Sequence, residues 1–199
     1  MRRLLPVLAF VACGAVRPLL GQWHLGLEFA TNTYRGSTHD TSSTHVASEG
    51  RPGGGVAVGL LFGRSWRRVG AALRVSFADP GFAVSGKDVY VKDKTTGRLL
   101  EVASLFSTRV GGIGPSGAIR AELGPALHLW DYGGEIRTRW SGLGAFAYEW
   151  PIAGRLTGAI RLEGMLSSSW FDATDVPPEF ERRATWRYGV GLGLRYRLT

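Results

Sequence analysis

The stretch "TWRYGVGLGLRYRLT" (185–199) divides its residues into two chemical classes at alternate positions. One parity holds only large apolar or aromatic residues: Trp186, Tyr188, Val190, Leu192, Leu194, Tyr196 and Leu198. The other parity holds three glycines together with Arg187, Arg195 and Arg197. Because successive side chains of a β-strand point to opposite faces, the stretch predicts a strand with one wholly apolar face and one face of glycine and arginine.

The composition favours strands and turns over helices. Glycine accounts for 29 of the 199 residues and is scattered through apolar runs, where each glycine would cost a helix about 1 kcal/mol. The formal net charge is +8, yet the arginines alternate along predicted strands instead of clustering, so nucleic acid is not a predicted partner. Cys13 is the only cysteine, which leaves no disulfide inside the domain.

The first residues have the pattern of an export signal. Arg2 and Arg3 precede a short apolar run at 4–16, and Arg17 interrupts that run. The run is too short to span a bilayer as a helix, and a basic start followed by a short apolar stretch is typical of a signal peptide. We therefore predict a signal peptide over residues 1–22 and one β-barrel domain over residues 23–199.

The two-residue alternation recurs along the whole domain and predicts eight strands of about 10–14 residues, long enough to cross a bilayer when tilted. Short turns follow the second, fourth and sixth strands, at 63–68, 111–117 and 151–155. Longer or more polar connections follow the other strands, including 131–137 and the stretch 79–98, which is predicted to contain a small hairpin near 87–98. Long loops on one rim and short turns on the other are typical of outer-membrane barrels.

Pro125 is the residue that fits this pattern least well, because proline cannot donate a hydrogen bond to the ladder of a strand with two neighbours. A bulge at Gly124–Pro125, or a shorter fifth strand, is the expected accommodation.

The number of large apolar side chains indicates which face of the sheet points outward. The apolar parity of the eight strands carries about 36 large side chains, whereas about twelve fill the interior of an eight-stranded TIM barrel. The apolar face must therefore point mostly outward, the reverse of a soluble lipocalin-like barrel. The predicted fold is all-β: a closed, antiparallel, eight-stranded, up-and-down transmembrane β-barrel.

The opposite parity carries charges of both signs, which we expect to form Arg–Glu pairs that plug the lumen, since confined charges persist only when paired. The predicted lumen network comprises Glu28, Arg74, Glu101, Arg109, Arg120, Glu122, His128, Glu149, Arg161, Glu163, Arg187, Arg195 and Arg197.

Aromatic residues lie near the ends of the predicted strands and predict two belts at the lipid–water boundaries. The belt toward the short turns comprises Trp23, Trp66, Trp150 and Tyr196. The belt toward the long loops comprises Phe77, Trp130, Trp140, Trp170 and Trp186.

With these features, and in the segments "AELGPALHLWDY" (121–132) and "YGVGLGLRYRL" (188–198), the chain resembles the small eight-stranded bacterial outer-membrane barrels, the OmpA-like and OmpX-like group. The resemblance covers about residues 22–199 and rests on pattern. It implies a location in the outer membrane, contact with outer-membrane lipid, and insertion by the barrel-insertion machinery. It also implies a structural or surface-interaction role, with loops that contact an extracellular ligand or surface. The alternatives are a narrow pore, a lipid-modifying enzyme such as some barrels of this size, and a soluble binding barrel.

No residue pattern predicts a catalytic, cofactor or metal site. His39 and His45 lie with Asp40 in a Ser/Thr-rich stretch, at a spacing that matches no established metal site. The glycine runs at 53–59 and 189–193 are not followed by a helix, so they lack the phosphate-binding arrangement. His128 shares its strand face with Glu122, which places it in the lumen away from a lipid acyl chain.

Overall fold

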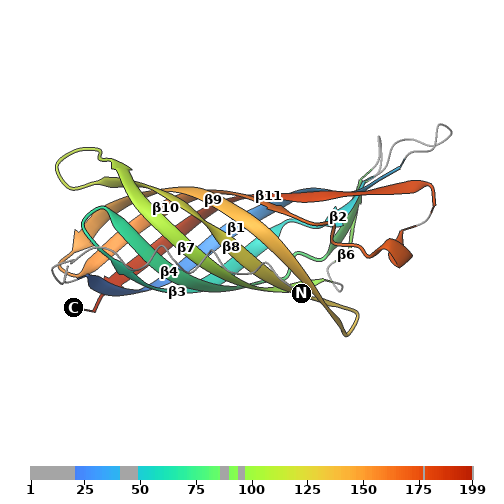
Figure 1. Ribbon diagram of the computed structural model, residues 1–199, viewed down its shortest axis with the longest axis horizontal. Coiled ribbons are helices and arrows are strands. Elements are labelled where there is room, and N and C mark those ends of the chain that lie inside the picture. Colours follow the sequence, from blue (N-terminus) through green and yellow to red (C-terminus); the bar gives the residue numbers. More distant parts are fainter. Residues whose placement is uncertain (1–20, 41–48, 86–89, 94–96, 177, 199) are drawn as a thin grey trace, which may run out of the picture.

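Eight long antiparallel strands close into a barrel in the computed structural model, which describes residues 21–40, 49–85, 90–93, 97–176 and 178–198 (Figure 1). The barrel strands are β1 (Gln22–Asp40), β3 (Gly55–Ser65), β4 (Val69–Ala78), β7 (Arg98–Gly111), β8 (Ala118–Tyr132), β9 (Glu135–Ala153), β10 (Leu156–Ser167) and β11 (Phe180–Arg197). Around the ring they run β1-β11-β10-β9-β8-β7-β4-β3, and β3 pairs with β1. The predicted fold class is thereby confirmed.

The predicted signal peptide falls almost entirely on residues 1–20, which lie outside the described residues, and β1 already begins at Gln22. Among the residues that are described, no helix is long and apolar enough to cross a membrane.

The closing strand β11 lies between the first strand and the strand before it. Leu194 is paired with Leu27, and Leu192 is paired with Phe29 on β1 and with Ile160 on β10. The register with β1 continues as far as Asp40↔Phe180, with one irregularity between Gly36 and Thr38. Every backbone group along the apolar stretch at 188–196 therefore has a strand on either side.

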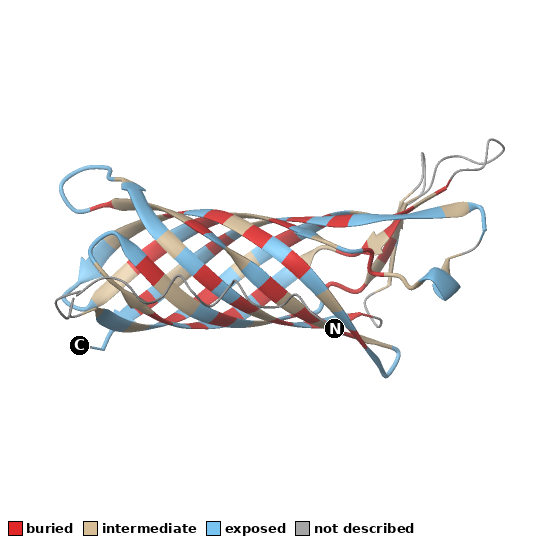
Figure 2. Cartoon of the chain, viewed as in Figure 1, coloured by how far each residue is buried: buried red, intermediate tan, exposed pale blue. Residues whose placement is uncertain are grey.

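The apolar parity faces outward around the barrel. Figure 2 shows buried and exposed residues alternating along the strands like a chequerboard. Leu123 on β8 is 69% exposed and Leu192 on β11 is 61% exposed, whereas the arginine and glutamate positions between such residues are mostly buried. The apolar face points outward in the structure, as the sequence predicts.

The end of the barrel away from the chain's C-terminus carries additional structure. Three short strands, β2 (Glu49–Pro52), β5 (Phe82–Ser85) and β6 (Tyr90–Asp93), form a separate sheet in the order β2-β5-β6 (Figure 1). The predicted hairpin near 87–98 is therefore displaced, because β6 pairs with β5 and the hairpin spans 82–93. The 3-10 helix η1 (Ala173–Asp175) lies between β10 and β11. We call this end the loop end and the opposite end the turn end.

One connection and one strand differ from what the sequence predicts. The predicted loop at 131–137 is a two-residue turn at Gly133–Gly134, both with positive φ (61° and 91°), as a tight hairpin requires. Strands β8 and β9 consequently extend to this turn, and β9 reaches 19 residues. The predicted bulge at Gly124–Pro125 is also wrong, because the β7–β8 register is the same on either side of it and β8 is continuous.

Pro125 is tolerated because of a close backbone approach at its neighbour. A Cβ atom on Gly124 would lie 1.8 Å from the backbone oxygen of Ser104. The absence of a side chain at Gly124 lets β7 and β8 come together where the proline donates no hydrogen bond.

Candidate functional site

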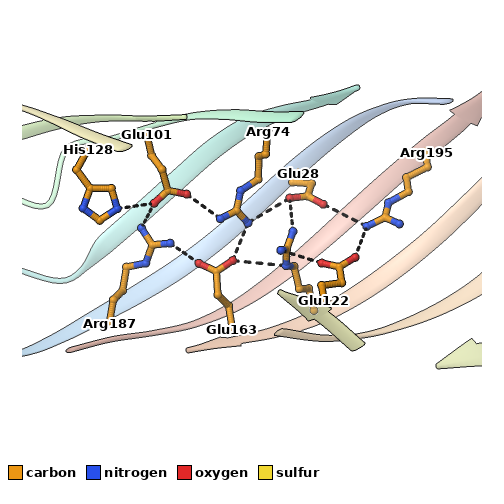
Figure 3. A network of polar contacts seen from close by, with 9 residues as sticks. Glu28, Arg74, Glu101, Glu122, His128, Glu163, Arg187 and Arg195 are labelled. Atoms are coloured by element: carbon orange, nitrogen blue, oxygen red, sulfur yellow. Dashed lines mark hydrogen bonds and ion pairs between the residues drawn. The ribbon is translucent and has the colours of Figure 1, made fainter. Parts of the chain in front are cut away.

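The interior of the barrel is occupied by one connected network of ionic side chains (Figure 3). Its members come from seven of the eight barrel strands, all except β3. They are Glu28, Arg74, Glu101, Arg120, Glu122, His128, Glu149, Arg161, Glu163, Arg187 and Arg195. Because inward parity recurs at every second residue, a strand can supply up to three of these groups, as β8 does, without disturbing its outer apolar face.

Glu101 on β7 is the most deeply buried member, with 0% of its side chain exposed. Its Oε1 accepts a hydrogen bond of 2.7 Å from Arg74 Nη2 on the neighbouring strand β4. Its Oε2 accepts from Arg187 on β11, across the lumen, and lies 3.0 Å from His128 Nε2. A carboxylate in this position links its own strand β7 to three others, β4, β8 and β11, through hydrogen bonds.

Glu163 on β10 occupies the facing position. Its Oε2 accepts from Arg74 Nη1 at 2.7 Å, and its Oε1 accepts from Arg187. Arg74 and Arg187 are thus each bound to both Glu101 and Glu163 (Figure 3). This four-residue ring links β4, β7, β10 and β11.

The network continues toward the turn end through Arg161 and Arg195. Arg161 Nη2 lies 2.8 Å from Glu122 Oε2, and Arg161 Nη1 lies 3.2 Å from Glu28 Oε2. Arg195 lies 3.5 Å from both Glu122 and Glu28, and it donates to Glu149. Glu149 also accepts from Arg120 Nε at 2.8 Å, which ends the network on β8.

Opposite charges balance in this network, because five arginines face five glutamates. In a medium of reduced dielectric, an unbalanced charge would carry a large desolvation penalty. The cavities left between these side chains are small: two of about 20 Å³ each lie beside Glu28 and Arg74, room for about one water molecule. The centre of the described lumen is therefore filled by side chains. A larger cavity of about 220 Å³ lies at the turn end, where Arg120, Glu149 and Arg195 are among its lining residues.

Two residues of the predicted network lie elsewhere. Arg109 and Arg197 are exposed at the turn end, and no ion pair joins either to a carboxylate among the described residues. Arg109 Nε donates to the backbone oxygen of Gly111, and Arg197 donates to the side chain of Gln22 and the backbone oxygen of Gly154. The parity of both is inward, but each lies so close to a strand end that water replaces a carboxylate partner.

The predicted aromatic belts separate into residues on the outer surface and residues inside. Seven of the nine lie at the outer surface or are partly exposed at the turn end: Trp23, Trp66, Phe77, Trp140, Trp150, Trp186 and Tyr196. Trp130 and Trp170 are instead buried, 3% and 2% exposed. Trp130 has the same parity as His128, which points inward. Trp170 lies beyond the end of β10, where the chain leaves the barrel wall and turns over its mouth.

Trp130 and Trp170 belong to an aromatic cluster that closes the loop end. The two rings lie 5.5 Å apart, and Trp170 also contacts Tyr132 (5.3 Å) and Phe82 (5.6 Å). Its other members are Tyr34, Ala57, Ala78, Leu99 and the partly buried Ala30 and Phe171. This cluster was not predicted from the sequence, although the parity of Tyr34 matches that of Glu28 and would have placed Tyr34 inside.

An ionic contact holds η1 against the barrel mouth. Arg137 on β9 donates to both carboxylate oxygens of Asp175, and Arg139 Nη2 donates to Asp172 Oδ1 at 2.8 Å. Partial burial alone would raise the pKa of Asp175, yet the backbone N–H of Asp172 and the Arg137 guanidinium hold that pKa below its ordinary value. η1 is therefore attached by charge as well as by its neighbours in the chain.

His128, Glu101 and Ser141 come close enough to be compared with a hydrolytic triad. In such a triad the acid and the nucleophile contact opposite nitrogens of the imidazole. Here both Glu101 Oε2 (3.0 Å) and Ser141 Oγ (3.2 Å) approach the same atom, His128 Nε2. Ser141 donates its hydrogen bond to the backbone oxygen of Ala126 at 3.1 Å. The contacts are those of a structural hydrogen-bonded group and lack the geometry of an activated nucleophile.

Fold and interior together define a small, closed, eight-stranded β-barrel with an ion-filled lumen and an apolar outer face. Solved structures of this kind resemble the chain. Neisserial surface protein A (NspA) matches with a TM-score of 0.55 at 10% identity, covering 88% of this chain and 97% of that one. The attachment invasion locus protein Ail of Yersinia pestis, in complex with the heparin analogue sucrose octasulfate, matches with a TM-score of 0.46 at 9% identity, covering 88% and 99%. Ail in a phospholipid bilayer nanodisc, described as an outer membrane protein, matches with a TM-score of 0.40 at 12% identity, covering 89% and 99%.

No family model and no curated protein sequence matches the chain. The likeness to NspA, at this identity, establishes the fold. The small eight-stranded outer-membrane barrels are the structures the sequence resembles, and at the level of fold that resemblance is confirmed.

Proposed function

We propose that the chain is an outer-membrane barrel that does not conduct and that binds a partner at the cell surface through its loop end. One observation supports this proposal above all. The loop end carries ordered structure, the β2-β5-β6 sheet, the β8–β9 hairpin and η1, set upon an aromatic cluster that closes the lumen beneath it.

The outer surface supports the membrane location. Large apolar side chains on all eight strands are exposed, among them Phe62, Leu123 and Leu192. Exposed apolar area of this extent is unfavourable in water. In hydrocarbon it is favourable, and the closed ring satisfies the backbone groups that a bilayer would leave without partners.

The filled lumen argues against the pore alternative. The ionic network joins opposite walls, and the aromatic cluster lies between the network and the loop end. An ion crossing the barrel would have to separate several buried ion pairs, each of which costs several kcal/mol to break. The lumen accordingly serves as a rigid plug that supports the loop end.

The loop end offers a mixed surface to a partner. Charged side chains of both signs lie there as ion pairs, such as Arg137–Asp175 and Arg183–Glu181. Ile136, next to the β8–β9 turn, is 72% exposed. Ordered strands that present apolar and paired charged groups suit a protein surface, because little conformational entropy is lost when such a platform binds.

Single-cysteine labelling tests location and orientation together. The only natural cysteine, Cys13, lies in the predicted signal peptide, so Arg183→Cys reports on the loop end and Arg67→Cys on the turn end. In intact cells a membrane-impermeant maleimide should label the first variant only. Both should be labelled after lysis, and the barrel should show heat-modifiable migration on gels. Labelling of both in intact cells, or recovery of the chain as a soluble protein without detergent, would refute the proposal.

Adhesion of whole cells tests the surface role. A non-adherent bacterium that expresses the chain should bind to cultured host cells or to another bacterial surface. A variant in which residues 82–93 are replaced by a short glycine-serine linker should lose binding and keep heat-modifiable migration. Shortening the turn at 111–117 in the same way provides the matched control. Equal adhesion of all three strains would contradict the surface role, and unitary currents in planar bilayers would favour the pore.

A further inference from the structure

The turn end is rich in arginine. Six arginines lie in or beside its turns: Arg64, Arg67, Arg68, Arg109, Arg155 and Arg197. The described residues around them, 22–27, 61–72, 105–119, 150–159 and 194–198, contain no aspartate or glutamate. We refer to these six residues as the turn-end arginines.

None of the turn-end arginines forms an ion pair with a carboxylate in the described part of the chain. Arg155 Nη1 approaches the backbone oxygen of Leu198 at 3.5 Å, and Arg197 and Arg109 contact backbone or amide oxygens. Glu149, inside the barrel, already accepts from Arg120 and Arg195. No carboxylate among the described residues therefore neutralises the positive charge of this rim.

The loop end does not share this property. Several of its arginines meet acidic partners, as in Arg137 with Glu135 and Asp175, and Arg139 with Asp172. The two ends of the barrel therefore differ in charge, because acidic residues stand among the described residues of the loop end and not among those around the turn-end arginines.

One of the turn-end arginines, Arg64, stands at the edge of the apolar outer surface. The Arg64 guanidinium carbon lies 5.2 Å from the ring centre of Trp23 and 5.6 Å from that of Trp66. Trp23 itself stacks on the outward ring of Phe62 at 5.0 Å. Tryptophan rings of this kind occupy the headgroup level of a bilayer. The Arg64 charge is thus held at the depth where lipid phosphates lie.

We propose that the turn-end arginines bind the phosphate groups of anionic phospholipids in the periplasmic-facing leaflet of the outer membrane. The proposal rests on the membrane location and orientation proposed above. Guanidinium groups pair well with phosphate oxygens. Each arginine close to an anionic lipid surface raises the association constant of the protein with that surface about fivefold. Anionic cell-wall polymer is the weaker assignment, because a soluble polymer would not require a cation, here Arg64, to stand against lipid-facing tryptophans.

Lipid selectivity provides the test. The full chain is refolded into vesicles of phosphatidylcholine into which brominated phosphatidylglycerol or brominated phosphatidylcholine is diluted, and quenching of tryptophan fluorescence yields the relative association of the two lipids. We expect a preference for phosphatidylglycerol of about fivefold or more at low salt, decreasing as salt screens the charges.

Matched variants assign the preference to one end. R67Q/R68Q/R155Q changes three exposed turn-end side chains that make no ion pair, and it should lower the preference at least threefold. R35Q/R98Q/R182Q removes the same charge from exposed positions of the loop end and should leave it unchanged.

Four other outcomes would contradict the lipid assignment, and they can be told apart. Insertion without any preference for phosphatidylglycerol, or an equal loss in both triple variants, would overturn the lipid assignment and leave the membrane barrel intact. Binding of a soluble cell-wall fragment by a chain that has no such preference would assign the rim to the polymer. A chain that inserts into neither type of vesicle would overturn the membrane location together with the inference.

Discussion

Glu101→Gln removes one negative charge from the most deeply buried point of the lumen and leaves the shape of the side chain almost unchanged. In the native barrel Glu101 accepts from Arg74 at 2.7 Å, from Arg187, and from His128 at 3.0 Å. Removal of one partner from a buried ion pair typically costs about 3–5 kcal/mol, because the other charge stays buried without compensation. Both arginines keep Glu163 as a second partner, so we expect a loss at the lower end, about 3 kcal/mol.

Urea titration of the chain in phospholipid vesicles, followed by gel mobility of the folded barrel, measures this loss. Arg109→Gln changes a charge outside the network and should alter the free energy of unfolding by less than about 0.5 kcal/mol. Glu101→Gln combined with Arg187→Gln restores the balance of charge, so the double variant should lose less than the sum of the single variants, with a coupling of about 1–3 kcal/mol. If Glu101→Gln unfolds at the same urea concentration as Arg109→Gln, the lumen network does not stabilise the barrel and the reasoning fails.

Three further predictions concern other parts of the molecule. Gly124→Ala should lower the yield of heat-modifiable barrel, because its Cβ would meet a backbone oxygen at 1.8 Å, whereas Gly142→Ala, with nothing within 4 Å, should fold normally. Trp170→Ala should cost the loop end about 3–5 kcal/mol of local stability and speed its proteolysis while the barrel still migrates as folded. Despite partial burial, the backbone N–H of Asp172 and the contact with Arg137 hold the pKa of Asp175 below its ordinary value of 3.8. These contacts therefore stabilise η1 fully at pH values above 3.8, and the stabilisation should be lost as the pH falls from 3.8 through the lowered pKa. Hydrogen exchange of residues 171–176 measures this loss, and Asp175→Asn should show it already at neutral pH.

The barrel wall could be predicted from the sequence because its two faces differ in chemistry at every second residue. Leu192 and Gly193 are neighbours in the chain, yet one faces outward and the other inward, and a shift of one residue would reverse both. The volume of the apolar side chains then decided which face is outside. Residue size and strand geometry are therefore enough to predict the barrel wall that the structure shows.

The loop end could not be predicted in the same way, because it depends on contacts between segments far apart in the chain. Phe82 follows β4, and Trp170 follows β10, yet their rings lie 5.6 Å apart. Nothing in the local pattern of either segment indicates the other. The parity of Trp170 also misleads, because alternation fixes direction only while the strand continues, and β10 ends at Ser167.

The three arginines of the final strand explain why parity alone is incomplete. Arg187, Arg195 and Arg197 share one face of β11, and a strand advances about 3.3 Å per residue, so they lie at different depths. Arg187 and Arg195 are buried, and each is bound to carboxylates of the lumen. Arg197 reaches the rim, where its side chain is exposed and contacts Gln22 and the backbone oxygen of Gly154, and where no carboxylate of the described residues pairs with it. In "TWRYGVGLGLRYRLT" the same residue type on the same face therefore serves two purposes. Within the barrel a charge must be neutralised by the protein, and at the turn end it stays available for an anion outside the protein.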